Sequence, residues 1–161
     1  MGAVRVHATT DPTERMRLWH ARHHSYEIMV RSAPDKKFFI NDVAVPISSY
    51  PDLINTIEQV RRDMQIDAYM IGHAGDGNIH VEFPFGTPEA YAAAMTANKL
   101  IVTRAIELGG TATGEHGVGI GKAPYLPLEH GEGLEVMRSI KQVLDPNGIL
   151  NPGKIFVESG S

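Results

Sequence analysis

The chain has 161 residues, no cysteine and a formal net charge of −4, from 15 basic and 19 acidic residues that are interspersed along it. This length fits one domain, the lack of cysteine excludes disulfides, thiolate nucleophiles and iron–sulfur ligation, and the charge pattern predicts no nucleic-acid partner. No apolar run reaches the roughly 18 residues of a membrane helix and the N-terminus lacks the features of a signal peptide, so we expect a cytoplasmic protein without a membrane span.

The first third of the chain predicts a helix and a strand. In residues 12–31 the apolar and aromatic side chains recur at spacings of three and four, the pattern of an amphipathic helix. Asp11 followed by Pro12 is typical of an N-cap and the first helical position. Residues 36–47, KKFFINDVAVPI, are rich in Phe, Ile and Val and predict a strand that ends at Pro46.

The rest of the chain alternates helices and strands. Residues 51–66 carry one apolar stripe and predict a helix, residues 68–85 predict two strands joined by a tight turn, and a third helix is expected from Thr87 to the glycine pair at 109–110. A glycine-rich loop and a helix over about 132–144 follow. We therefore predict a single α+β domain over 1–161, with helices packed on one face of a mainly antiparallel sheet.

The turn between the two predicted strands brings two histidines together. Asp76-Gly77 is a strong signal for a two-residue type I′ hairpin loop, which places His73 directly opposite His80. Cross-strand partners have Cβ atoms about 4.5 to 5.5 Å apart, so both rings can reach one metal ion. The ordinary alternative is a pair of polar residues at a sheet surface. The opposite face of the hairpin is expected to enter the core through Met70, Ile79, Val81 and Phe83.

The glycine-rich loop places a carboxylate beside an imidazole. It reads TATGEHGVGIGK, and Glu115 in it can supply the oxygen ligand that would turn the two imidazoles into a three-ligand site with open positions, the form that a catalytic ion takes. His116 then lies within reach of whatever fills an open position. A solvated Glu-His pair is the alternative for this motif taken alone.

Three ordered motifs carry a family resemblance. The segments GHAGDGNIHVEF, TGEHGVGIGKAPYL and LDPNGILNPGKIF together resemble the C-terminal substrate domain of the FAD-linked oxidases, the family that includes D-lactate, glycolate and D-2-hydroxyglutarate dehydrogenases. LWHARH and INDVAVP are similar as well, so the resemblance covers nearly the whole chain. It implies a ferredoxin-like sheet that covers the flavin, and a divalent ion, zinc or manganese, held by His73, His80 and Glu115.

The resemblance also implies roles for single residues. His116 is the candidate base that takes the substrate hydroxyl proton, and Arg22 matches an arginine that binds the substrate carboxylate, with an exposed helix charge as the alternative. Lys122 is expected to face substrate or phosphate, Asn151 to lie near the flavin, and Asn78 to orient the site. A purely structural role is the alternative for Asn78 and Lys122.

The implied reaction is the oxidation of a 2-hydroxy acid to a 2-oxo acid, with the C2 hydride passing to FAD. No segment here has the order of a dinucleotide-binding fold, so the FAD-binding domain is expected in cis or in trans, and this chain is expected to be an inactive fragment alone. An unpaired edge strand predicts a capacity to form a homodimer, and an electron-transfer partner is expected to link the protein to a membrane surface. The alternatives are a stand-alone metal-binding or interaction domain without redox activity, and a small metal-dependent hydrolase or lyase.

Overall fold

The computed structural model describes residues 7–156, which divide into two units at the boundary between Lys36 and Lys37. The unit before this boundary consists of two helices, and the unit after it contains the sheet.

The first unit contains α1 (Pro12–His23) and α2 (Ser25–Ser32). Asp11 caps α1 as predicted, because its carboxylate accepts a hydrogen bond of 2.8 Å from the backbone N–H of Glu14. The prediction of one continuous helix is wrong at His24, whose φ of −97° and ψ of 6° leave the helical region. Next to this break the hydroxyl of Ser25 donates to the carbonyl of Arg22, a local hydrogen bond that competes with the helical pattern.

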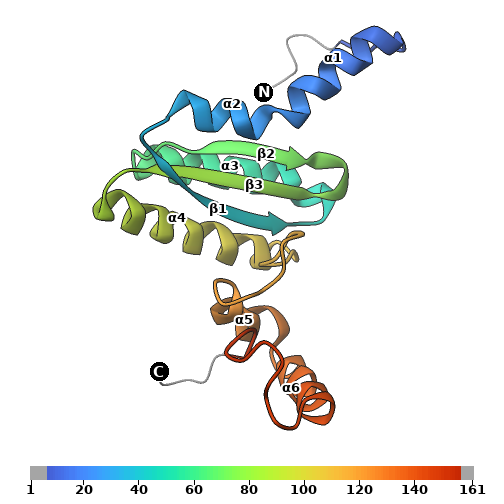
Figure 1. Ribbon diagram of the computed structural model, residues 1–161, viewed down its shortest axis with the longest axis vertical. Helices are drawn as coiled ribbons and strands as arrows, with labels where there is room; N and C mark the ends of the chain where they lie inside the picture. The colour runs from blue at the N-terminus through green and yellow to red at the C-terminus, as the bar shows by residue number, and fades with distance from the viewer. Residues whose placement is uncertain (1–6, 157–161) are drawn as a thin grey trace. The chain divides into compact units, whose positions relative to one another are not determined.

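The second unit is built on a three-stranded antiparallel sheet. Its strands are β1 (Lys37–Ala44), β2 (Tyr69–His73) and β3 (Asn78–Phe85), and β3 lies in the middle (Figure 1). Helix α3 (Tyr50–Asp63) connects β1 to β2, and α4 (Pro88–Glu107) follows β3. This order is the split βαβ arrangement of ferredoxin-like domains. The α+β class is therefore confirmed.

One bridge marks the place of a further strand. Ala44 at the end of β1 pairs antiparallel with Thr111, on the edge of β1 that faces away from β3. The two backbone hydrogen bonds of this pair are 3.4 and 2.8 Å long. The start of the glycine-rich loop is thus attached to the edge of the sheet by a single pair of residues.

The core lies between the sheet and the helices α3 and α4. The two helices contact each other, and α4 also contacts the strands β1 and β3. The stripe predicted on α3 supplies Leu53, Ile57 and Val60, and the predicted apolar face of β3 supplies Ile79, Val81 and Phe83. Helix α4 begins where the sequence predicts, with the Thr87 hydroxyl accepting from the Ala90 N–H at 3.2 Å. Because one face of the sheet is buried against α3 and α4, the alternate residues of β3 lie on the opposite face.

Two helices follow the glycine-rich loop. Helix α5 (Leu126–His130) was not expected, and α6 (Gly133–Leu144) matches the predicted last helix. No side chain of α6 is buried among the described residues, although one side of the helix is apolar. The exposed side chains of this stripe are Val136, Met137, Ile140, Val143 and Leu144. An exposed stripe of this kind is typical of a surface that packs against further protein.

The register of the β2–β3 hairpin differs from the prediction by two residues. His73 pairs with Asn78, and His80 pairs with Ile71, so the two histidines are diagonal neighbours rather than direct partners. Only Gly77 has a positive φ in the turn, 72°, whereas a type I′ loop needs two such residues. The reason lies outside the hairpin, because the Gly77 carbonyl accepts a 3.0 Å hydrogen bond from Val45 at the end of β1. The shift of two residues keeps both histidines on one face.

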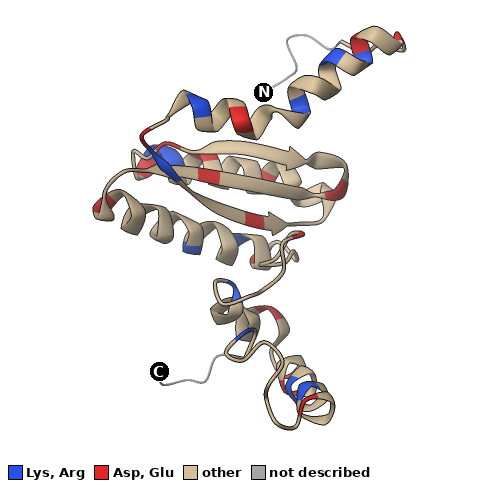
Figure 2. Cartoon of the chain, in the orientation of Figure 1, with Lys and Arg blue, Asp and Glu red and all other residues tan. Residues whose placement is uncertain are grey.

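Charged residues of both signs are interspersed over the elements of the described chain (Figure 2). No helix within residues 7–156 is long and apolar enough to cross a membrane.

The turn offers a test of this register. A Cβ added at Gly77 would lie 1.9 Å from the Val45 carbonyl oxygen, whereas one added at Gly75 would meet nothing within 4 Å. Gly77→Ala is expected to lower the free energy of unfolding by roughly 1–3 kcal/mol, because alanine is strained at positive φ and here also collides with backbone. Gly75→Ala is the matched control and is expected to stay within about 0.5 kcal/mol of the parent. Denaturant unfolding measures both, and equal stabilities would contradict this turn geometry.

Candidate metal centre

Three ligand atoms from three segments meet at one end of the sheet. His80 Nε2 of β3 lies 2.9 Å from Glu115 Oε1 of the glycine-rich loop, and His73 Nε2 of β2 lies 3.8 Å from the same oxygen. Ligands bound at about 2.0 to 2.1 Å around a tetrahedral ion are roughly 3.3 Å apart. The donor atoms of these three residues lie within 4.8 Å of one another, so a small adjustment brings all three onto one divalent ion.

Strand alternation explains why the two histidines share this face. Ile79, Val81 and Phe83 turn toward α3 and α4, so the residues between them on β3 turn to the other side. His73 lies on that side as well, because it pairs with Asn78 in the ladder. The rings of His73 and His80 are 5.8 Å apart between centroids and perpendicular.

The three candidate ligands differ in exposure. The His80 side chain is only 10% exposed, whereas those of His73 and Glu115 are 43% and 53% exposed. One ligand is thus fixed in the protein and two border solvent. Such a site keeps coordination positions open on one side, as a catalytic ion requires.

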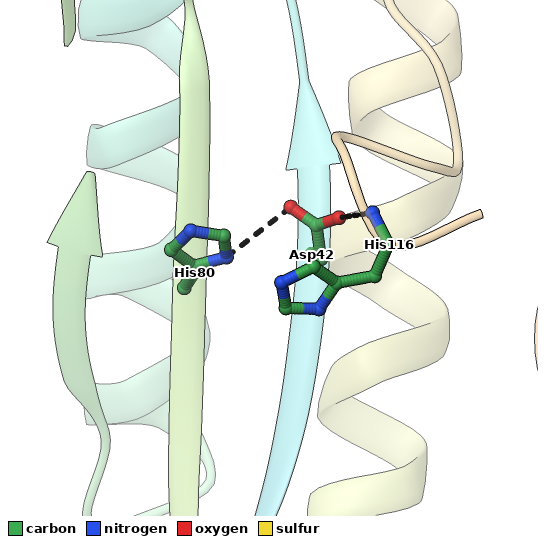
Figure 3. A group of neighbouring side chains, drawn as sticks. All are labelled: Asp42, His80 and His116. Atoms are coloured by element: carbon green, nitrogen blue, oxygen red, sulfur yellow. Dashed lines mark hydrogen bonds and ion pairs between the residues drawn. The ribbon is translucent and has the colours of Figure 1, made fainter. Parts of the chain in front are cut away.

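Asp42 of β1 lies behind this site and was not singled out by the sequence. Its Oδ2 accepts hydrogen bonds from the backbone N–H of Glu115 at 2.6 Å and of His116 at 2.9 Å. Its Oδ1 accepts from the Asn78 amide at 2.7 Å. The same oxygen lies 3.2 Å from His80 Nδ1 (Figure 3). Burial raises the pKa of Asp42, but the two N–H groups, the amide and His80 outweigh it and hold that pKa below its usual value. The carboxylate is therefore ionised at neutral pH.

His116 lies beside the three ligands. Its ring stacks on that of His80, with centroids 5.1 Å apart and planes 16° from parallel, and its Nε2 is 3.9 Å from Glu115 Oε1. Asp42, His80 and His116 form a second group with ligand-like spacing. The first group is the better ion site, because the oxygens of Asp42 already accept three hydrogen bonds and face His80 Nδ1.

The Lys122 amine binds β1. It donates to Asn41 Oδ1 at 2.6 Å and to the Asp42 carbonyl at 3.1 Å, and so fastens the end of the glycine-rich loop to the strand. Burial lowers the pKa of Lys122 to about 8, against the opposing effect of Asp42 and Glu129. Lys122 also lines a cavity of about 310 Å³ together with His116. Its predicted contact with substrate remains a prediction.

The geometry of this cluster does not test two further predicted sites. Arg22 lies in α1 of the first unit, so its predicted contact with a substrate carboxylate stays a prediction. Asn151 lies in the turns after α6, with a positive φ of 48°, and its flavin contact also stays a prediction. Asn78, which was expected to orient the site, donates its amide to Asp42 and to the Val43 carbonyl.

Two residues of the cluster were missed by the sequence analysis. Asp42 had one signal, an acid inside a segment of strand-forming residues, but its partners are distant in sequence. Gly114 is the second, because a Cβ there would lie 2.1 Å from Asp42 Oδ1 and 2.0 Å from Asn78 Nδ2. The loop can approach β1 this closely only with glycine at that position.

Comparison with known proteins places these features in a family. The family profile described as FAD linked oxidases, C-terminal domain, matches residues 1–155. The chain is 43% identical over 152 residues to the mitochondrial D-lactate dehydrogenase [cytochrome] of Kluyveromyces lactis, which covers 91% of this chain and 26% of that protein. It is 36% identical over 159 residues to the glycolate oxidase subunit GlcD of Bacillus subtilis, which covers 97% of this chain and 33% of that protein. The chain therefore spans about a quarter to a third of these relatives. The predicted cytoplasmic location remains a prediction.

The buried amine of Lys122 predicts a pH dependence of stability. Its folded pKa of about 8 lies below the ordinary value of 10.5, so between these pH values the unfolded chain binds more protons than the folded chain. The free energy of unfolding is therefore expected to gain a contribution as pH rises from 8 to 10.5. Lys122→Met removes this contribution, and the same change at exposed Lys99 serves as the control. Denaturant unfolding at pH 7.5 and 10 measures it; an identical pH response in parent and Lys122→Met would contradict the burial of the charge.

Proposed function

The chain belongs to the family of C-terminal domains of FAD-linked oxidases, and from this premise we propose that it is the metal- and substrate-binding portion of a flavin-dependent 2-hydroxy-acid dehydrogenase or oxidase. The relatives are named for D-lactate and glycolate, which are both 2-hydroxy acids. The observation that carries the proposal is the meeting of His73, His80 and Glu115 on one face, with the His116 imidazole beside them.

The residues present fit a divalent ion, zinc or manganese. Two imidazoles and one carboxylate form a common catalytic ligand set, and the buried Nδ1 of His80 has an ionised carboxylate next to it, as a histidine that binds metal through Nε2 requires. When bound, the ion would act as a Lewis acid on the 2-hydroxy acid, and the flavin would accept the hydride from C2.

The protein's own contribution is orientation and proton transfer. His116 Nε2, next to Glu115, accepts the proton of the substrate hydroxyl. The hydrogen on C2 leaves as hydride to the flavin, and a 2-oxo acid remains. His80 stacks on His116 and limits the directions in which that ring can turn. On the basis of the family motifs, we assign Arg22 to the carboxylate of the substrate and Lys122 to the substrate as well. Asn151 is assigned to the flavin.

A flavin-binding domain is the partner that this function requires. The relatives are three to four times as long as the stretch they share with this chain. We assign the FAD to a separate domain, in cis or in trans. The chain alone is expected to bind metal without turnover.

The metal site is tested by elemental analysis. The purified chain is stripped with a chelator, reloaded with zinc or manganese and dialysed. About one equivalent is expected in the parent, and His73→Ala, His80→Ala and Glu115→Ala are each expected to lose most of it, because two remaining ligands hold an ion weakly. His20→Ala, an exposed histidine of the first unit, is the matched control and should retain it. Equal metal in all five proteins would overturn the ligand assignment.

The base is tested in the complete enzyme. The chain is joined to its flavin-binding domain, or mixed with it, and the oxidation of D-lactate and glycolate is followed with a redox dye. His116→Asn is expected to lower kcat by about 100-fold or more while the bound metal is unchanged, because only proton transfer is removed. An unaltered kcat would exclude His116 as the base. Turnover of a substrate by the chain without flavin would instead indicate a hydrolase or lyase.

A further inference from the structure

We infer that Asp42 is the positioning residue of the metal site, with one carboxylate that both sets the tautomer of His80 and holds the backbone that carries Glu115. The inference rests on the proposed function for the ion itself. It goes beyond that proposal by assigning the assembly of the site to a residue that is not a ligand.

The two oxygens of Asp42 have separate tasks. Oδ2 faces the loop and accepts from two successive backbone N–H groups, those of Glu115 and His116. Oδ1 faces β3, where it accepts from the Asn78 amide and lies next to His80 Nδ1. Figure 3 shows the carboxylate between the strand of His80 and the loop of His116. A carboxylate has room for about four donors, so Asp42 is saturated and is not available as a metal ligand.

The position of Oδ1 determines which nitrogen of His80 can bind metal. The ring is almost fully buried, and its Nδ1 has no aligned hydrogen bond among the described residues except the approach of Asp42 at 3.2 Å. An oxygen 3.2 Å from Nδ1 is placed to accept a hydrogen bond from a proton on that nitrogen, which leaves the lone pair on Nε2. Nε2 is the atom that faces Glu115 at 2.9 Å. In the opposite tautomer an N–H would point at the ion.

The position of Oδ2 determines where Glu115 stands. The side chain of Glu115 is half exposed, so its placement depends largely on its backbone. Two charge-assisted hydrogen bonds, of 2.6 and 2.9 Å, fix that backbone on β1. Gly114 permits this approach, since a Cβ there would overlap Asp42 and Asn78, and Lys122 fastens the far end of the same loop to β1.

The test compares Asp42→Asn with Asp76→Asn, an exposed acid of the nearby turn that undergoes the same change of charge. An amide has one acceptor oxygen, so Asp42→Asn leaves some of the donors around it unpaired. Zinc affinity, measured by competition with a chelator, is expected to fall roughly 10–100-fold in Asp42→Asn and to be unchanged in Asp76→Asn. Nitrogen-15 NMR of the zinc form is expected to show Nδ1–H with Nε2 bound in the parent, and loss of that single pattern in Asp42→Asn.

Two further readouts keep the inference separate from the proposed function. The amide proton shifts of Glu115 and His116 report the Oδ2 hydrogen bonds without metal, and they are expected to change in Asp42→Asn. Unchanged amide shifts overturn the inference, whether or not the parent binds zinc. Absence of zinc binding in the parent would by itself overturn only the metal site. Equal zinc affinity and an unaltered His80 pattern also overturn it. If Asp42→Asn fails to fold, Gly114→Ala replaces it. The added Cβ would collide with Asp42 Oδ1 and Asn78 Nδ2, so the loop and the carboxylate cannot keep their present contact and zinc affinity should fall; unchanged affinity is the contrary result.

Discussion

The buried carboxylate of Asp42 is the constraint on which the rest of the site depends. An anion removed from water is stable in a protein only when donors surround it, and here the donors come from β3 and from two consecutive peptide groups of the glycine-rich loop. The need to satisfy this charge therefore joins segments that are 36 and more than 70 residues apart in the chain. The same carboxylate stands behind the histidine that is least exposed. The pairing of the strands and the arrangement of the candidate ligands thus share one carboxylate.

The elements of the fold could be predicted because their signals are local. Asp11 and Thr87 cap helices where the sequence places them, and apolar spacing identified the buried sides of α3 and β3. The hairpin register could not be obtained in this way. Asp76-Gly77 favours a two-residue turn by itself, but the contact of Gly77 with Val45 belongs to the tertiary structure and selects a longer loop. The error had no consequence for the face of the histidines, since strand alternation has a period of two.

The same difference between local and tertiary information determines which residues of the candidate site could be predicted. His73, His80, Glu115 and His116 could be proposed as site residues because they stand in two short motifs that are visible in the sequence. Asp42 could not, because its role arises only when β1 pairs with β3 and when the loop returns to the edge of β1. The single bridge between Ala44 and Thr111 is what brings that return about. Pairings of this kind join residues far apart in the sequence and so leave no periodic pattern along the chain.

The distribution of burial across the site separates metal binding from turnover. Asp42 and Asn78 are buried next to His80, whereas the side chains of His73, Glu115 and His116 are about half exposed. A proton transfer and a hydride transfer both need a closed, preorganised environment, since water competes for the base and screens the charges. In the proposed reaction this closure has to come from the surface that brings the flavin. On this proposal, ligand geometry would be a property of this chain, and the chemical step would be a property of its junction with the proposed flavin-binding domain.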